Sequence, residues 1–289
     1  MSDVPTCLPP IRDTRESTLD LPSGAVDCHT HVFDSRYPLS ADRGYDPPDS
    51  TLDDMRAMHA KLGIERVVFT QPSVYGTDNS AILDAADQLG DLARAVVALP
   101  MSVTDHELEA LDRRGARGVR LNLDNAGGMP IGMDDIPSMA DRIRELGWHL
   151  EFLFAAGELG ELAPLFRSLS VPVSIGHFAY IPATAGVDHP SFGVLLELVR
   201  EGDTWVKLSA PNRLGVGDLP PWPAVVPMAG ALIEAAPERV VWASDWPHPN
   251  KFTAQPNDAD LIEQLALWAP DESMRRRILV ENPTALYRF

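Results

Sequence analysis

Two histidines spaced two residues apart are the first side chains in the sequence that suggest chemistry. His29 and His31 end an apolar stretch that starts at Gly24, and a strand with a period of two residues directs both side chains to the same face. Two imidazoles on one face can supply half of a metal site or half of a general acid/base site. Such pairs also occur on solvent-facing strands and in satisfied cores, so the interpretation depends on partners elsewhere in the chain.

Apolar segments alternate with segments of helical character from residue 24 onwards. After the strand with the two histidines, we expect strands at residues 66–71, 95–99, 118–123, 148–154, 171–176, 204–209 and 239–244. We expect helices at residues 51–62, 79–89, 105–114, 133–146, 158–169, 192–200, 223–236, 259–268 and 272–280. This alternation predicts an α/β fold, a single-domain (β/α)8 barrel over residues 24–289. Residues 1–23, rich in proline and charge, are expected to form an N-terminal arm.

Barrels of this class carry their active sites where the strands end and the following loops begin. The polar residues at these ends form the candidate set, which comprises His29, His31, Gln71, Ser73, Arg120, Asn122, Glu151, His177, Lys207, Ser209, Arg213 and Asp245. Residues that are far apart in the sequence are therefore expected to converge on one rim of the barrel.

Charge and composition exclude several classes of partner. The formal net charge is −18, from 24 basic and 42 acidic residues, and such a chain is repelled by nucleic acid and by anionic membranes. Two cysteines are too few for a disulfide framework, and no apolar run reaches the roughly 18 residues of a membrane span. We expect a cytoplasmic protein that acts on a small molecule, and a homo-oligomer is compatible with the sequence.

Six segments carry a resemblance to a known family. They are residues 26–33 (VDCHTHVF), 71–79 (QPSVYGTDN), 118–122 (GVRLN), 207–209 (KLS), 242–249 (WASDWPHP) and 282–287 (NPTALY). Through them the sequence resembles the amidohydrolase superfamily of the amidohydrolase-2 type. Within it, the sequence is similar to the lactonase branch that contains 2-pyrone-4,6-dicarboxylate lactonase and 4-sulfomuconolactone hydrolase.

The resemblance implies a hydrolase that opens a lactone with acidic substituents, of the muconolactone or pyrone-carboxylate kind met in the catabolism of aromatic compounds. It implies that Asp245 is the general base that takes a proton from the attacking water. His29, His31 and His177 would stabilise the oxyanion, either by holding a divalent metal or by hydrogen bonding to the oxygen directly.

The resemblance leaves open whether a metal is needed. Many amidohydrolases hold zinc, whereas the pyrone-dicarboxylate lactonase works without a metal. His29, His31, His177 and Asp245 are enough ligands for one catalytic zinc with an open position. Glu151 could add an oxygen ligand or could be a charge paired near the rim. We expect one divalent metal, zinc first, with metal-free catalysis as the alternative.

Two arginines are the candidates for binding an anionic substituent, because a guanidinium offers a planar fork of donors to a carboxylate or sulfonate. Arg120 and Arg213 both stand where relatives keep substrate-binding arginines. The bland alternatives are a salt bridge within the barrel for Arg120 and a solvated loop charge for Arg213. Tyr45, Ser73 and Tyr75 could add neutral hydrogen bonds, and for Tyr75 plain packing is the alternative.

Two departures from the pyrone-dicarboxylate lactonase pattern concern the substrate. That pattern carries further basic residues after the fourth strand and a tyrosine near the end of the fifth. Residues 124–130 contain no lysine, arginine or histidine. The fifth strand ends in Phe152-Leu153-Phe154, without a tyrosine. A smaller, less charged or sulfonated lactone is therefore expected to fit better than a planar dicarboxylate.

Two other readings compete with lactone hydrolysis. On the same scaffold, a metal-dependent, non-oxidative decarboxylase of an unsaturated or aromatic acid would use a similar set of histidines and Asp245. Release of carbon dioxide would identify that enzyme. A non-catalytic binding protein is the second alternative, and the filled acid/base positions argue against it.

Overall fold

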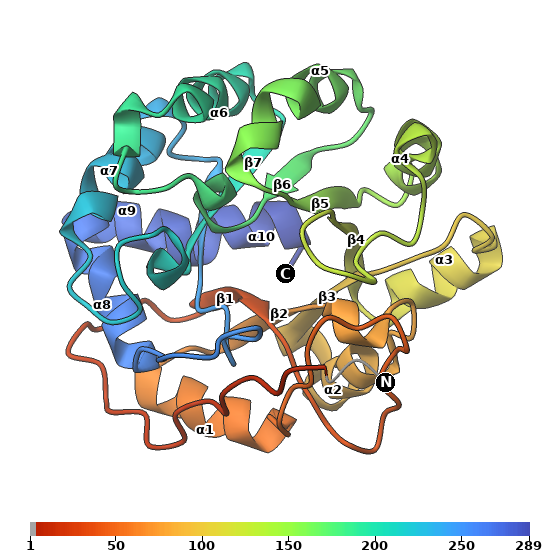
Figure 1. Ribbon diagram of the computed structural model, residues 1–289, viewed down its shortest axis with the longest axis horizontal. Helices are drawn as coiled ribbons and strands as arrows, with labels where there is room; N and C mark the ends of the chain where they lie inside the picture. Colours follow the sequence, from red (N-terminus) through yellow and green to blue (C-terminus); the bar gives the residue numbers. More distant parts are fainter. Residues whose placement is uncertain (1–3) are drawn as a thin grey trace.

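Eight parallel strands form a barrel in the computed structural model, which describes residues 4–289. The strands are β1 Val26–Thr30, β2 Arg66–Thr70, β3 Ala93–Val97, β4 Ala116–Asn122, β5 His149–Leu153, β6 Val173–Ile175, β7 Thr204–Ser209 and β8 Val240–Ala243. They neighbour each other in sequence order. Two backbone hydrogen bonds close the ring between the ends of β8 and β1, from Asp245 N to His29 O at 3.1 Å and from His31 N to Trp246 O at 2.8 Å. The predicted (β/α)8 fold is confirmed (Figure 1).

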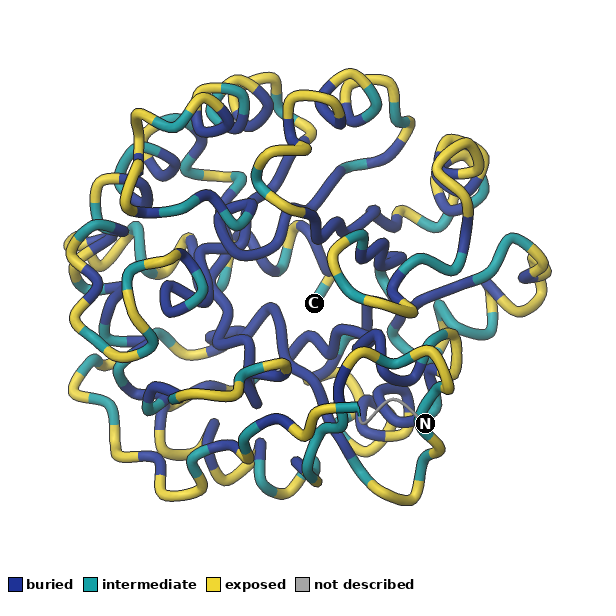
Figure 2. Tube along the Cα trace, viewed as in Figure 1, coloured by how far each residue is buried: buried dark blue, intermediate teal, exposed yellow. Residues whose placement is uncertain are grey.

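Helices surround the strands, with their inner faces buried and their outer faces exposed (Figure 2). They are α1 Leu52–Leu62, α2 Ser80–Leu89, α3 Asp105–Arg113, α4 Ile136–Arg144, α5 Leu159–Ser168, α6 Pro190–Glu201, α7 Val226–Ala235, α8 Asp258–Trp268, α9 Glu272–Arg276 and α10 Asn282–Tyr287. Among residues 4–289, none of these helices is long and apolar enough to span a bilayer.

Local sequence explains where several helices begin and end. Thr51 and Thr104 cap α1 and α3, and each forms a capping box with the acidic residue three positions later. The helix expected from residue 133 begins at Ile136 after a short 3-10 turn, because Pro137 is suited to the first turn of a helix. The last expected helix ends at Arg276 and continues through a π-helical turn into α10, which the sequence analysis did not predict.

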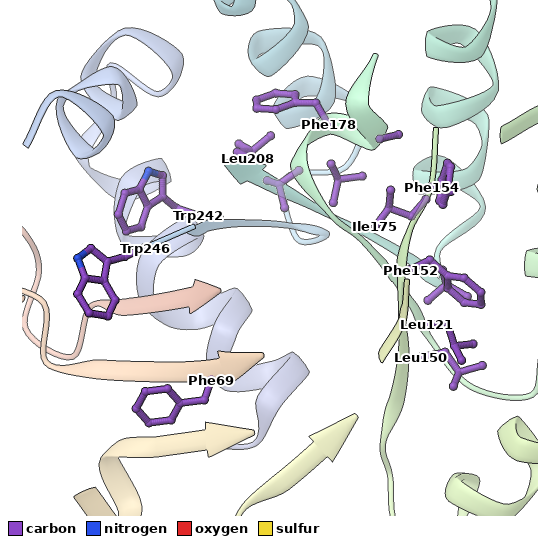
Figure 3. Packing of buried hydrophobic residues seen from close by; sticks show 14 of the residues in the cluster. Phe69, Leu121, Leu150, Phe152, Phe154, Ile175, Phe178, Leu208, Trp242 and Trp246 are labelled. Atoms are coloured by element: carbon purple, nitrogen blue, oxygen red, sulfur yellow. The ribbon is translucent and has the colours of Figure 1, made fainter. Parts of the chain in front are cut away.

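Large apolar side chains between the strands and the helices hold the barrel together (Figure 3). Phe152 on β5 and Phe154 directly after it contact Phe166 on α5, with ring centroids 4.7 and 5.8 Å apart. Trp242 and Trp246 are buried in the same outer layer. Leu153, which alternates with the two phenylalanines, is therefore the side chain that β5 directs inward at its end.

The N-terminal arm connects two loops at the carboxyl end of the barrel. Residues 4–23 contain no helix or extended strand. The amide of Cys7 donates to Asp46 O at 3.0 Å in the loop after β1, and the amide of Leu8 donates to Lys251 O at 2.8 Å in the loop after β8. The arm thus fixes the spacing between these two loops.

Candidate active site

Three histidines and one aspartate meet at the carboxyl end of the barrel, as the sequence predicted. His29 and His31 lie at the end of β1, His177 directly follows β6, and Asp245 follows β8. The Oδ1 atom of Asp245 lies 3.9, 3.8 and 3.5 Å from the Nε2 atoms of His29, His31 and His177. All four side chains are buried. One carboxylate oxygen therefore faces three imidazoles in a site largely shielded from bulk water.

Strained backbone directs some of these side chains into the site. The four residues 177–180 all have left-handed backbone, with φ of 50° at His177 and 51° at Tyr180. Asp245 is left-handed as well, with φ of 65°. For residues other than glycine this conformation costs about 1–2 kcal/mol each. Such strain concentrates at functional sites because the surrounding fold compensates for it.

An arginine donates a hydrogen bond to the second carboxylate oxygen of Asp245. Arg213 Nε donates to Asp245 Oδ2 at 2.7 Å, and Arg213 Nη2 donates to Pro249 O at 2.6 Å. Burial alone would raise the pKa of Asp245, but the charge of Arg213 holds it well below its ordinary value. Asp245 is therefore ionised at neutral pH, with Oδ1 free. Arg213 is a buried partner of Asp245 and not a solvated loop charge.

Two of the histidines present bare nitrogen atoms to the free oxygen. His31 Nδ1 lies 2.7 Å from the carbonyl oxygen of Thr70, which only accepts, so Nδ1 carries the proton. His177 Nδ1 lies 2.8 Å from Ser209 Oγ, whose hydroxyl donates to Lys207 O. Burial lowers the pKa of His31 and lowers that of His177 to about 3, so both rings are neutral. Both Nε2 lone pairs and Asp245 Oδ1 thus converge with no donor among them.

The third histidine is held between two cations. Lys207 Nζ lies 3.0 Å from His29 Nδ1, and Arg120 Nη1 lies 3.1 Å from His29 Nε2. Burial, followed by the charges of Lys207 and Arg120, holds the pKa of His29 well below its ordinary value. His29 is therefore neutral, and a neutral imidazole can accept a hydrogen bond from only one of these two cations.

Glu151 pairs with a lysine behind His29. Its Oε2 accepts from Lys207 Nζ at 2.5 Å, and its Oε1 lies 3.3 Å from His29 Nδ1, the ring atom opposite the one that faces Asp245. Lys207 also donates to Cys28 O at 2.8 Å. The expectation that Glu151 is a metal ligand therefore has no support in this geometry, because a neighbouring cation occupies its carboxylate.

Within residues 4–289, the donor atoms that could hold a metal ion together belong to His29, His31 and Asp245, whose atoms lie within 4.8 Å of one another. Imidazole nitrogen and carboxylate oxygen are ligands that zinc uses, and the converging lone pairs suit a cation. The donor set therefore fits one divalent ion. His177 is not part of this group, although its Nε2 lies close to Asp245. Arg120 would compete with an ion for the lone pair of His29 Nε2.

A cavity of about 240 Å³ opens above Asp245. Its lining comprises His31, Tyr45, Pro72, Ser73, Arg120, Asn122, Asp124, Asn125, Leu153, His177, Tyr180, Arg213, Asp245, Pro249, Asn250 and Lys251. The structure thus brings the predicted substrate-binding residues together, with one exception. Tyr75 does not line the cavity, because its hydroxyl is bonded to the backbone of Asp34, accepting from the amide at 3.1 Å.

Sequence reasoning missed several polar side chains of the cavity, among them Tyr180 and Lys251. Tyr180 stacks on His177 with ring centroids 5.5 Å apart, and burial raises the pKa of Tyr180 to about 12, so its hydroxyl stays neutral. Lys251 lines the cavity from the loop after β8. The positions of both residues, shortly after His177 and Asp245 in the sequence, could have signalled them.

The comparisons with known proteins agree with this geometry. The sequence matches the model of the family described as Amidohydrolase over residues 26–289. It is 38% identical over 291 residues to a 4-sulfomuconolactone hydrolase from Hydrogenophaga intermedia, covering 98% of this chain and 95% of the relative. It is 36% identical over 277 residues to a 2-pyrone-4,6-dicarboxylate hydrolase from Comamonas testosteroni, covering 92% and 91%.

A solved structure is similar over nearly the same range. It is described as a probable 2-pyrone-4,6-dicarboxylic acid hydrolase from Acinetobacter baumannii with citric acid bound. It shares 26% identity with this chain at a TM-score of 0.78, covering 92% of this chain and all of the other. The family match over residues 26–289 and these full-length similarities lead to one conclusion. The chain belongs to the amidohydrolase family.

Proposed function

We propose that this protein hydrolyses a small lactone that carries anionic substituents. The observation that carries the proposal is the buried, ionised Asp245, whose free oxygen faces neutral imidazoles at the floor of a cavity lined by Arg120, Arg213 and Lys251. A carboxylate in this position can accept a proton, and cations above it can bind an anion. The activities named for the relatives, hydrolysis of 4-sulfomuconolactone and of 2-pyrone-4,6-dicarboxylate, support the same chemistry.

Water attack starts at Asp245. A water molecule between Asp245 Oδ1 and the bare Nε2 atoms of His31 and His177 would donate its protons to these acceptors. Asp245 takes one proton as the water oxygen bonds to the lactone carbonyl carbon. When the ring carbon–oxygen bond breaks, the same proton passes to the leaving alkoxide. The products are a carboxylic acid and a hydroxyl group, and Asp245 regains its charge.

The oxyanion of the tetrahedral intermediate needs donors or a cation. His29 Nε2 lies 3.9 Å from the free oxygen of Asp245, and it can carry a proton and donate to the oxyanion when Lys207 donates to His29 Nδ1. A divalent ion held by His29, His31 and Asp245 would act as a Lewis acid on the carbonyl when bound. The chain's own task in either case is to keep these donors in place.

Arg120 is the side chain best placed to bind an anionic substituent. It lines the cavity, and its Nε is buried without a hydrogen-bond partner among the described residues. We expect Arg120→Gln to lower kcat/KM for an anionic lactone by about 10- to 100-fold, because a charge-assisted hydrogen bond contributes about 1.5–3 kcal/mol. Steady-state kinetics on an anionic and a neutral lactone would measure the loss. Arg117→Gln is the matched control, since Arg117 is paired with Asp112 outside the cavity. An equal loss on both lactones would contradict this role.

Lactone hydrolysis measured before and after chelation, with metal analysis of the purified protein, tests the proposed function. We expect about one divalent ion per chain, zinc first, that a chelator removes with loss of activity and that zinc or manganese restores. Full hydrolysis without metal would mean that the metal part is wrong and that the chain's own donors meet the oxyanion. Release of carbon dioxide without ring opening would favour the decarboxylase and overturn the proposal.

A further inference from the structure

We infer that Lys251 is a specificity-determining residue that binds a second anionic group of the substrate at the mouth of the cavity, in exchange for its present partner Asp218. The inference rests on the proposed function and adds the residue that would bind a second anionic substituent of the substrate. Arg120 and Arg213 also line the cavity, and the role inferred for Lys251 does not require either arginine to move.

Lys251 is positioned by contacts on both sides. Its carbonyl oxygen accepts from the amide of Leu8 in the N-terminal arm at 2.8 Å. The preceding Asn250 donates through Nδ2 to Asn125 Oδ1 at 3.3 Å, which joins the loop after β8 to the loop after β4. Asn250 is left-handed, with φ of 59°. The lysine therefore stands on a braced segment and not on a free loop.

The ion pair of Lys251 is one that a ligand can replace. Lys251 Nζ donates to Asp218 Oδ1, and Asp218 Oδ2 accepts from Thr253. The two charged side chains are 14% and 28% exposed, so water reaches the pair. Thr253 would still bond to Asp218 after the lysine leaves. By contrast, Lys207 is fully buried with three partners and cannot be released in this way.

The two arginines of the cavity already have partners near the reacting centre. Arg213 is committed to Asp245 and Pro249, and Arg120 lies against His29 beside the reacting centre. Among the lining residues, Lys251 is then the remaining lysine or arginine that can bind a second anionic group. Lys251 provides a compact charge that accepts a carboxylate or a tetrahedral sulfonate, because an ammonium imposes no planar geometry.

Lysines are rare in this chain, and this rarity provides the control. The sequence contains three, Lys61, Lys207 and Lys251. Lys61 is a surface residue on α1, 53% exposed and paired with Glu16, which is 79% exposed. Lys61→Met removes the same charge and side chain without touching the cavity. Lys251→Met and Lys61→Met are therefore a matched pair of variants.

The test compares 4-sulfomuconolactone, which carries a carboxylate and a sulfonate, with muconolactone, which carries the carboxylate alone. We expect Lys251→Met to lower the ratio of kcat/KM values, dianion over monoanion, by about tenfold, chiefly through KM. Lys61→Met is expected to keep the ratio of the wild type, and Lys251→Arg is expected to recover part of it. Asp218→Asn, which frees the lysine, is expected to lower KM for the dianion.

The outcomes separate this inference from the function on which it rests. If the wild type hydrolyses neither lactone, the proposed function is wrong. If it hydrolyses both and Lys251→Met leaves their ratio unchanged, the proposed function stands and the role of Lys251 is wrong. A loss of the same factor on both lactones would also overturn the inference, because a purely structural role predicts it.

Discussion

Asp245→Asn is expected to lower kcat for lactone hydrolysis by about 10²- to 10⁴-fold, the range for loss of a positioned general base. The amide can still accept from Arg213 through its oxygen, so the contact at 2.7 Å can persist, but it cannot take a proton from water. The effect should fall on kcat, because binding of the anionic substituents depends on other side chains. Single-turnover kinetics and calorimetric titration of the substrate would separate the two quantities.

Two controls make this result interpretable. Asp134→Asn, at an exposed position outside the cavity, is the matched substitution and should leave kcat unchanged. Asp245→Asn also leaves Arg213 without its counter-charge, and loss of one partner of a buried pair can cost about 3–5 kcal/mol of stability. Urea unfolding should therefore accompany the kinetics. A folded variant that keeps kcat within tenfold of the wild type would show that another group activates the water.

Lys207→Met should produce the largest loss of stability. The side chain of Lys207 is completely buried, with 0% exposure. It is hydrogen-bonded to Glu151, His29 and Cys28. Burial raises the pKa of Glu151, but Lys207 and Arg120 together hold it below its ordinary value. Without the lysine a buried carboxylate loses its main partner, and we expect a decrease of about 3–5 kcal/mol in the free energy of unfolding.

A double variant distinguishes this explanation from a simple loss of packing. If the cost comes from the unpaired carboxylate, Lys207→Met combined with Glu151→Gln should be more stable than Lys207→Met alone. Urea unfolding of both single variants and the double variant would complete the cycle. Lys61→Met, which removes an exposed lysine, should stay within about 0.5 kcal/mol of the wild type. Additive losses in the double variant would contradict the charge-pair account.

The barrel could be predicted because its signals are local and repeat along the chain. Apolar strands alternate with capped helices, and caps such as Thr51 and Thr104 can be read from single residues with an acidic residue three positions later. The fold then placed His29, His177 and Asp245 together, since all strands of such a barrel end at one rim. Residues more than 200 positions apart thus became neighbours without any pairwise signal.

The partners of individual charges could not be predicted in the same way. Glu151 was a candidate metal ligand, but it pairs with Lys207 on β7, across the barrel. Tyr75 follows the strand whose end carries cavity residues, but a short 3-10 turn at Ser73–Tyr75 directs it to Asp34. Side-chain direction at a strand end depends on the next few backbone angles, and the sequence carries only weak information about them.

Irregular backbone was the other limit. A strict period of two places His29 and His31 on one face, but the pairing of β1 with β2 shifts register between Asp27 and Thr30. The left-handed run at residues 177–180 contains no glycine, so glycine could not signal it. That run directs both His177 and Tyr180 to the cavity. Strain of this kind is imposed by tertiary structure, which explains why Tyr180 was missed.

The central claim is that water opens the lactone ring, and isotope labelling tests it most directly. The protein would be incubated with 4-sulfomuconolactone in water enriched in oxygen-18, and the product would be analysed by mass spectrometry. We predict a ring-opened product with one labelled oxygen in the new carboxylate. Because the sulfonate is on the carbon that bears the leaving oxygen, the α-hydroxysulfonate formed on ring opening releases bisulfite and leaves a ketone at that carbon. An unlabelled product, from rearrangement of the ring, or a product lighter by carbon dioxide would contradict the claim.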